Sequence, residues 1–307
     1  MNAILTEHLT RCYGDLKALD DVSFEVPAGQ FVAMLGPNGA GKTTTIEILE
    51  GFLAPTSGSV QVLGSDPRRG GRDWRSRIGV VTQSTSLDGQ LSVRDLLSTF
   101  GQLYPNPLPV AEVLEMVDLT DEAGVRVDTL SGGQQRRVDV AVGLIGRPEI
   151  LFLDEPTTGL DPEARRRVWG GIEKLAAKGM TVLLTTHYLE EANQFADRVI
   201  VISKGRVVAD TTPEELRTRG GHTIIRYPLP DGAPVNSLPP ALADHLDEQR
   251  REIIVRSGDV NAALRALIRW ADAQHLDLSG MEVGPPSLEE AYLSITGEQL
   301  PTESDHG

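Results

Sequence analysis

Short, unbroken apolar runs alternate with segments of helical periodicity over the first two thirds of the chain. Segments 163–177 and 188–196 carry apolar residues at helical spacing, and each follows one of these runs. Continuous apolarity is typical of strands buried on both faces, as in a parallel sheet covered by helices. This order predicts an α/β core. The runs are FVAML at 31–35, ILFL at 150–153, TVLLTT at 181–186 and RVIVI at 198–202.

Residues 92–146 lack any such run and have helical periodicity almost throughout. Their apolar residues recur three or four positions apart, as they do in amphipathic helices. We therefore expect a helical subdomain, about 84–146, inserted into the α/β core.

A domain boundary is predicted near residue 220. A glycine pair at 220–221 follows an amphipathic stretch, and a proline-rich segment occupies 228–240, which is typical of a linker. We expect one domain over 1–220 and a small α+β domain over 221–307, with strands near 223–227 and 252–256. A helix over 259–273 should follow, and its apolar positions are Val260, Leu264, Leu267, Ile268 and Ala271.

The chain is acidic, with 29 basic and 44 acidic residues and a net charge of −15. Residues 221–307 alone hold 6 basic and 14 acidic residues. A field of this sign repels a nucleic-acid backbone, so no nucleic-acid partner is expected. The same field repels a nucleotide at long range, but salt screens the repulsion beyond ~8 Å. Nucleotide binding therefore depends on the groups that contact the nucleotide directly.

The sequence also bears on location. The apolar runs are far shorter than the ~20 residues that span a bilayer. The N-terminus lacks the basic and apolar regions of a secretory signal. The single cysteine, Cys12, excludes an intrachain disulfide and fits a reducing compartment. We expect a cytoplasmic protein.

A glycine-rich loop follows the first apolar run. Residues 36–43, GPNGAGKT, fit the pattern G-x-x-x-x-G-K-[ST] in full, and a helix through 44–49 comes next. The backbone N–H groups of such a loop and the helix N-terminus surround phosphate oxygens. Lys42 would reach the β- and γ-phosphates, and Thr43 would ligate Mg²⁺; a glycine turn without function is the competing interpretation. The expected ATP-binding residues are Gly36, Asn38, Gly39, Gly41, Lys42, Thr43 and Thr44.

Two carboxylates, Asp154 and Glu155, end the apolar run at 150–153. An open parallel sheet binds ligands at the carboxyl ends of its strands. Asp154 would hold Mg²⁺ through water. Glu155 would accept a proton from an attacking water, which accelerates a reaction by about 10²–10⁴-fold. Together with the phosphate loop, this pair predicts ATP hydrolysis.

The segment LSGGQ at 130–134 resembles the signature loop of the ATP-binding cassette family, which ordinary phosphate-loop ATPases lack. The resemblance covers about residues 3–215. It implies a P-loop ATPase with a parallel sheet core, an N-terminal antiparallel β subdomain and the helical insert. It also implies adenine stacking for Tyr13, Mg²⁺ ligation and switching for Gln83, a dimer contact for Asp161, and catalysis by His187 and Gln83 alongside Glu155.

The signature loop opens a helix, so the N–H groups at Ser131 and Gly133 would face an anion. In the family this anion is the γ-phosphate of ATP held by a second subunit. One chain carries one phosphate loop and one signature loop. We therefore expect a homodimer, two copies head to tail with two ATP molecules between them.

The run PPSLEEAYLSITGE at 285–298 resembles the tail of ATPases of the daunorubicin-exporter type, and its apolar spacing predicts a closing helix. The resemblance implies export of a hydrophobic small molecule, such as an antibiotic, through a separate transmembrane permease. The chain would then lie on the inner face of the cell membrane and contact it only through the permease. Two alternatives stay open: the ATPase of an importer or other membrane complex, and a soluble cassette ATPase in translation or repair.

Overall fold

The computed structural model describes residues 1–82, 87, 89–219, 223–230, 233–239, 242, 245–247, 251–257 and 259–297. The chain divides into two compact units, Met1–Pro213 and Glu214–Gly307. The division lies a few residues before the boundary expected near residue 220. In the described part of the chain, no helix has the length and apolarity needed to cross a membrane.

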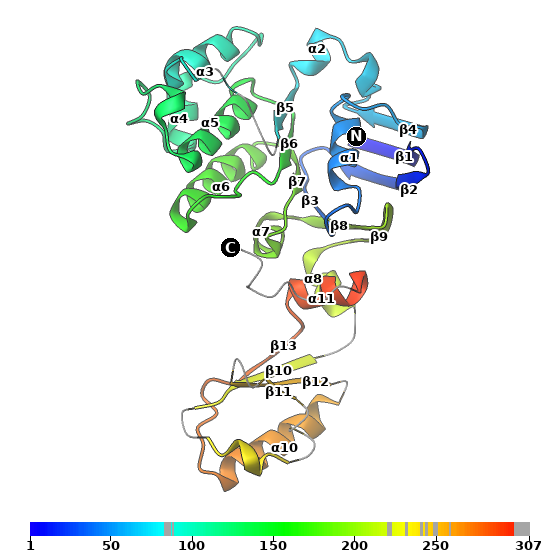
Figure 1. The fold of residues 1–307 in the computed structure, drawn as a ribbon, viewed down its shortest axis with the longest axis vertical. Helices are drawn as coiled ribbons and strands as arrows, with labels where there is room; N and C mark the ends of the chain where they lie inside the picture. The colour runs from blue at the N-terminus through cyan, green and yellow to red at the C-terminus, as the bar shows by residue number, and fades with distance from the viewer. Residues whose placement is uncertain are drawn as a thin grey trace. The chain divides into compact units, whose positions relative to one another are not determined.

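A six-stranded sheet forms the centre of the first unit (Figure 1). Its strands are β3 (Phe31–Leu35), β5 (Ile78–Val81), β6 (Ile150–Asp154), β7 (Thr181–Thr185), β8 (Arg198–Ser203) and β9 (Arg206–Thr211). Their order is β5-β6-β7-β3-β8-β9, and only β9 pairs antiparallel with its neighbour. Every residue of β3, β6 and β7 is buried. The prediction of a parallel sheet from continuous apolar runs is confirmed.

A second, antiparallel sheet lies on one side of the central sheet, together with helix α1 (Lys42–Leu49) (Figure 1). Its strand order is β2-β1-β4. This is the N-terminal β subdomain that the family resemblance implied. The remaining elements here are β1 (Asn2–Tyr13), β2 (Leu16–Pro27), β4 (Ser57–Val62), η1 (Pro67–Arg69) and α2 (Arg72–Arg75).

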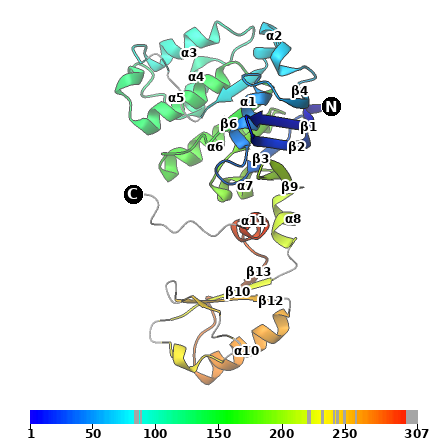
Figure 2. The same ribbon diagram turned by 45° about the vertical axis from the view of Figure 1, so that its right-hand side comes forward.

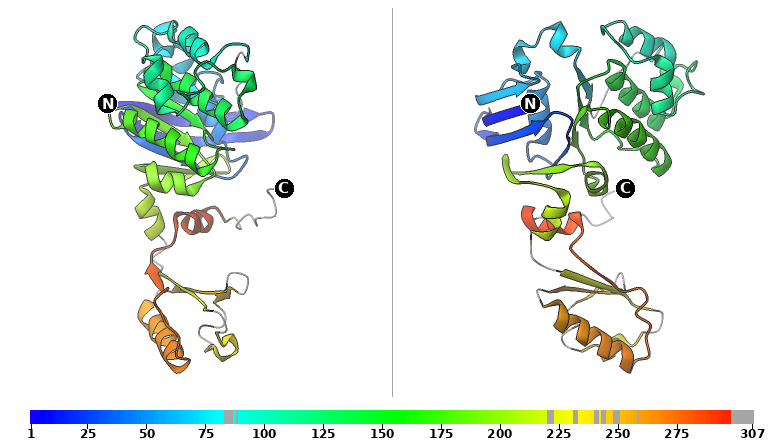
Figure 3. Two further views of the ribbon diagram at one scale, coloured as in Figure 1. Left: turned by 90° about the vertical axis from the view of Figure 1, so that its left-hand side faces the viewer. Right: turned by 180° about the vertical axis from the view of Figure 1, so that it is seen from behind.

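Helices cover the other side of the central sheet, as the view from behind also shows (Figure 3). The insert after β5 is helical, which confirms the prediction made from its periodicity. It is followed by two helices that connect the strands of the core. These elements are α3 (Val93–Gly101), α4 (Val110–Met116), η2 (Val127–Thr129), α5 (Gly132–Ile145), α6 (Pro162–Ala176) and α7 (Leu189–Phe195).

The central sheet separates two hydrophobic cores. Ile150 and Phe152 of β6 pack with the β subdomain, whereas Leu151 and Leu153 pack with the helical side. Successive strand residues point to opposite faces, and here both faces are covered. Polar side chains that follow these strands therefore gather at the carboxyl edge of the sheet.

The second unit is a four-stranded antiparallel sheet in the order β11-β12-β10-β13, with α10 along one face (Figure 2). It has the α+β composition expected. Ile268 does not join the buried face of α10 as its spacing predicted, because it is 41% exposed and Trp270 is buried instead. The elements are α8 (Pro213–Thr218), β10 (Thr223–Pro228), η3 (Val235–Ser237), β11 (Leu246–Asp247), β12 (Glu252–Ser257), α10 (Val260–Ala273), β13 (Glu282–Gly284) and α11 (Leu288–Thr296).

Candidate functional site

The glycine-rich loop joins the carboxyl end of β3 to the N-terminus of α1. Gly41 caps the helix with φ of +108°, and a Cβ there would lie 2.6 Å from a Leu19 methyl group. At Gly36 a Cβ would lie 2.3 Å from the Ile202 carbonyl oxygen. Both positions therefore require glycine, and the loop can adopt this curl only because side chains are missing.

Lys42 is the first residue of α1 and is only 9% exposed. Its Nζ donates to the carbonyl oxygens of Gly36, at 2.5 Å, and Pro37, at 3.1 Å. The amine thus lies against the loop itself. Thr43 is exposed and Thr44 is half-buried, and Asn38 and Gly39 are exposed on the loop.

Asp154 is the last residue of β6 and Glu155 follows it, beside the end of β7. Asp154 is buried, and its Oδ1 accepts a hydrogen bond from the Thr185 hydroxyl. Glu155 has φ of +48°, a left-handed conformation that is costly for a residue with a side chain. Its N–H donates to the Thr185 carbonyl at 3.0 Å, so the bend between strand and loop is fixed by the neighbouring strand.

His187, after β7, meets Glu155. The His187 Nδ1 lies 3.5 Å from Glu155 Oε2, and the two side chains are 43% and 17% exposed. In the sheet β7 lies between β6 and β3. The phosphate loop, the two carboxylates and His187 therefore follow three adjacent parallel strands. The structure brings these predicted residues to one edge, where an open parallel sheet binds ligands.

The signature loop lies elsewhere in the same chain. Ser131 caps α5, and its Oγ accepts from the Gln134 N–H at 3.2 Å while the Gln134 side chain accepts from the Ser131 N–H at 3.0 Å. Helices α5 and α1 lie on opposite sides of the central sheet (Figures 1 and 3). Gly133 is half-buried and lines a cavity of about 630 Å³ with Thr158 and Gly159.

Tyr13 and Asp161 occupy exposed positions, as a contact with another molecule requires. The Tyr13 ring, at the end of β1, is 45% exposed, and the Arg11 guanidinium carbon lies 4.6 Å from its centroid. Asp161 caps α6, and its Oδ1 accepts from the N–H groups of Glu163 and Ala164. These backbone hydrogen bonds hold the pKa of Asp161 below its usual value. Gln83 lies outside the described residues.

Arg136 is a site residue that the sequence reasoning missed. This α5 arginine is 8% exposed, and its guanidinium donates to four carbonyl oxygens, those of Thr82, Asp154, Glu155 and Pro156. It therefore joins the signature helix to the loop that carries the two carboxylates. Arg136 lies four residues before the buried Val140 and therefore on the apolar face of α5. This helical spacing could have indicated from the sequence that Arg136 is buried.

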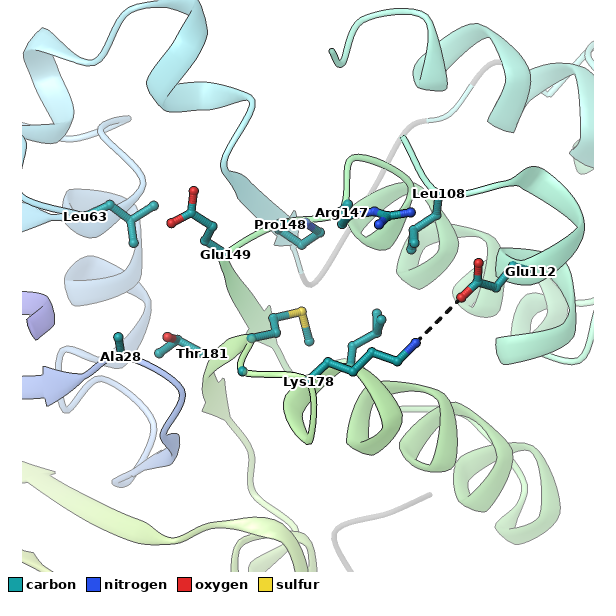
Figure 4. Close-up of a pocket in the computed structure, with 12 residues that line it drawn as sticks. Ala28, Leu63, Leu108, Glu112, Arg147, Pro148, Glu149, Lys178 and Thr181 are labelled. Carbon is teal, nitrogen blue, oxygen red and sulfur yellow. Dashed lines mark ion pairs between the residues drawn. The ribbon is translucent and has the colours of Figure 1, made fainter. Parts of the chain in front are cut away.

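A second cavity, of about 430 Å³, lies at the opposite edge of the sheet, where β6 and β7 begin (Figure 4). Charged side chains on its rim pair with one another: the Lys178 amine lies 4.0 Å from the Glu112 carboxylate (Figure 4). Glu149, also in its lining, holds Arg77 in a bidentate pair at 2.6 and 2.9 Å. These pairs lie far from the phosphate loop in the sheet, so the cavity belongs to a different surface.

Comparison with known families agrees with this geometry. A sequence model described as ABC transporter matches residues 19–158, and one described as ABC transporter domain-containing protein-like, C-terminal domain, matches residues 223–287. A solved ATP-binding subunit of an ABC transporter has a TM-score of 0.65 and 28% identity, and the match covers 71% of this chain and 93% of that one. The chain belongs to the ABC transporter family, as an ATP-binding and ATP-hydrolysing subunit.

Within this family, drug-resistance ATPases align with nearly the whole chain. The daunorubicin resistance ATP-binding protein DrrA3 of Streptomyces coeruleorubidus is 39% identical over 96% of both chains. The Nod factor export ATP-binding protein I of Paraburkholderia xenovorans is 36% identical, over 97% of this chain and 98% of its own. A dimeric, post-hydrolysis ATP-binding cassette bound to ADP and Pi has a TM-score of 0.62 and 28% identity, and the match covers 68% of this chain and 98% of that one.

Proposed function

We propose that this chain powers the export of a hydrophobic small molecule through a separate transmembrane permease. The observation that carries the proposal is the similarity to the daunorubicin resistance and Nod factor export ATP-binding proteins over 96–97% of the chain. This similarity extends through the second unit and is not confined to the ATPase fold. The chain would act at the inner face of the cell membrane, held there by the permease.

The phosphate loop would hold the ATP phosphates. The curl that would surround them depends on Gly36 and Gly41, where a Cβ would collide with Ile202 and Leu19 of the fold itself. The Lys42 amine already lies at the loop and would exchange carbonyl partners for phosphate oxygens, which are stronger acceptors. The exposed Tyr13 ring would stack on the adenine, with Asn38, Gly39 and Thr44 completing the contact.

Glu155 would act as the general base. As the oxygen of a water attacks the γ-phosphorus, its proton passes to the Glu155 carboxylate, and the bond to the ADP oxygen breaks. His187, 3.5 Å from this carboxylate, would contact the γ-phosphate, and Gln83 would help to orient the water. The strained backbone at Glu155 would hold its carboxylate in place before ATP arrives.

Mg²⁺ fits the oxygen donors present at this edge. Thr43 and Asp154 offer a hydroxyl and a carboxylate there, and Gln83, which lies outside the described residues, would add an amide oxygen. Mg²⁺ prefers such ligands together with substrate phosphates. When bound, it would neutralise charge that develops on the phosphates.

A second copy of the chain would complete each site. In one chain the signature loop and the phosphate loop lie on opposite sides of the central sheet. Ser131 and Gly133 of one copy would therefore meet ATP held by the other, with Asp161 at the contact. The similarity to a dimeric cassette supports this arrangement, and two identical loops related by a two-fold axis make it symmetric.

Affinity purification of the tagged chain from detergent-solubilised membranes of its own host tests the proposal. We expect ATP hydrolysis in the purified fraction and a polytopic membrane protein in equal amount, identified by mass spectrometry. The Glu155→Gln chain should recover the same membrane protein without hydrolysis. Recovery of ribosomes at physiological salt, with no membrane protein, would refute a transport function.

A further inference from the structure

We propose that Glu191 is a positioning residue that fixes His187 and Glu155 relative to each other for hydrolysis. This inference rests on the proposed roles of His187 and Glu155. Glu191 lies in α7, four residues after His187, and is only 3% exposed. A carboxylate so deeply buried is costly unless hydrogen bonds satisfy it.

Three side chains donate to the Glu191 carboxylate. Oε1 accepts from the Thr157 hydroxyl and, at 3.0 Å, from the Trp169 indole N–H. Oε2 accepts from the Thr186 hydroxyl at 2.7 Å. These donors come from the loop after β6, from α6 and from the end of β7, so one carboxylate joins three segments.

Two of the three donors are next to the reacting groups in sequence. Thr157 comes two residues after Glu155, and Thr186 immediately precedes His187. The Thr186 oxygen also accepts from the Tyr188 N–H at 2.9 Å, which fixes the backbone on both sides of His187. Glu191 thus holds the backbone beside each reacting group, although it lies too deep to touch a nucleotide itself.

The Tyr188 ring and the Arg165 guanidinium stack in turn beside the His187 ring. The His187 and Tyr188 rings lie 4.1 Å apart between centroids. The Arg165 guanidinium carbon lies 4.1 Å from the Tyr188 centroid, within range of a cation–π contact. Arg165 Nε is also 3.8 Å from Glu191 Oε1. Arg165 belongs to α6, so the helix that Asp161 caps is coupled to the His187 loop.

A carboxylate is the group that this arrangement requires. It accepts through both oxygens, whereas a glutamine accepts through one and donates through the other end. The amide of Glu191→Gln would keep the Thr157 and Trp169 hydrogen bonds but point an N–H₂ group at Thr186. The Thr186 oxygen could accept from this amide as well as from the Tyr188 N–H, but its own hydroxyl proton would lose its carboxylate acceptor. Leaving this buried donor unpaired is costly, so the loop bearing His187 would shift.

Steady-state ATP hydrolysis by the full chain tests the proposal. For Glu191→Gln we expect kcat to fall by about 10- to 100-fold, the range that a small misplacement of reacting groups produces. The KM for ATP should change less than threefold. Thr186→Val, which removes the same hydrogen bond from the other side, should behave alike. Glu190→Gln, at the exposed neighbouring position, is the matched control and should keep the wild-type kcat.

A double-mutant cycle separates positioning from general loss of structure. If Glu191 acts through His187, then Glu191→Gln should lower kcat less than twofold in a His187→Ala background. An equal fall in both backgrounds, or a wild-type kcat in both Glu191→Gln and Thr186→Val, overturns the proposal. If Glu191→Gln does not fold, Thr186→Val decides by the same two criteria. Absence of hydrolysis in the wild-type chain would instead reject the proposed function.

Discussion

His187 Nδ1 and Glu155 Oε2 lie 3.5 Å apart, although the two residues follow different strands. The register of those strands explains the distance, because Asp154 pairs with Thr185 in the parallel ladder between β6 and β7. Each strand ends at this pair, and the next one or two residues carry the reacting side chains. The hydrogen bond from the Glu155 N–H to the Thr185 carbonyl holds Glu155 against the end of β7.

Glu155→Gln is expected to bind ATP and to stop hydrolysis. The amide keeps the size of the side chain but cannot accept the proton of water, so kcat should fall by at least about 100-fold. ATP should then hold two copies together on gel filtration. Glu173→Gln, an exposed position on α6, should leave both properties unchanged. A monomeric variant that still turns over ATP would contradict the role of Glu155.

Two inactive variants should restore activity when they are mixed. Lys42→Ala removes the phosphate-binding amine, and ATP binding should be lost in a fluorescent-nucleotide assay. Ser131→Asp keeps a residue that caps helices well but places a negative charge where the γ-phosphate of the partner would lie. Random exchange of subunits produces hybrids with one intact site, so about a quarter of the wild-type rate should return. A mixture as inactive as its components would exclude composite sites.

Arg136→Met is expected to destabilise the first unit. It leaves four carbonyl oxygens without their donor and removes a partner of Asp139, 3.5 Å away. The loss should be about 2–5 kcal/mol in urea unfolding. Arg166→Met, at an exposed position, should change stability by less than about 0.5 kcal/mol. Equal effects of the two substitutions would show that the Arg136 hydrogen bonds contribute little.

Glu50 should make stability fall as the pH rises. Burial at the end of α1, with repulsion from Asp154 and Glu47, raises the pKa of Glu50 to about 8. The folded chain therefore keeps this proton while the unfolded chain releases it, and each pH unit between about 5 and 8 costs up to about 1.4 kcal/mol. Glu50→Gln removes the titration. It should match the wild type near pH 5 and be increasingly more stable towards pH 8.

Thermal unfolding followed from pH 5 to 8 measures this difference. Glu47→Gln, on the same helix but half-buried, is the control and should reproduce most of the pH dependence of the wild type. A difference between the wild type and Glu50→Gln that stays constant with pH would show that Glu50 does not hold a proton in the folded chain.

The parallel core was predictable because its strands are buried on both faces. The apolar residues of FVAML, ILFL and TVLLTT are consecutive, and these runs match β3, β6 and β7 almost residue for residue. The long hairpin of β1 and β2 has no such pattern. Its register shifts at several points, and His8 and Asp21 have φ of +51° and +64°. These irregularities break the period-2 alternation by which a half-buried strand is found.

The phosphate loop and the two carboxylates were predictable because their chemistry depends on residues that are close in sequence. Glu191 was not, because it acts through contacts that come from distant segments. The apolar spacing of α5 placed Arg136 on a buried face but could not identify the four carbonyl oxygens to which it donates. Glu190 and Glu191 are identical and adjacent in sequence, yet one is exposed and the other is 3% exposed. Two adjacent glutamates in a helix usually indicate a face exposed to solvent. Only the packing of α7 against α6 and β7 shows that Glu191 is buried.

The capping box at the signature loop limits how Ser131 can meet a ligand. Its oxygen accepts the Gln134 N–H, which occupies one of its two lone pairs and leaves the hydroxyl proton to be donated. The backbone amides at the start of α5 are also donors. The loop thus offers several hydrogen-bond donors to an anion, and in the proposed dimer, hydrolysis that carries the terminal phosphate away would remove the group that joins the two copies.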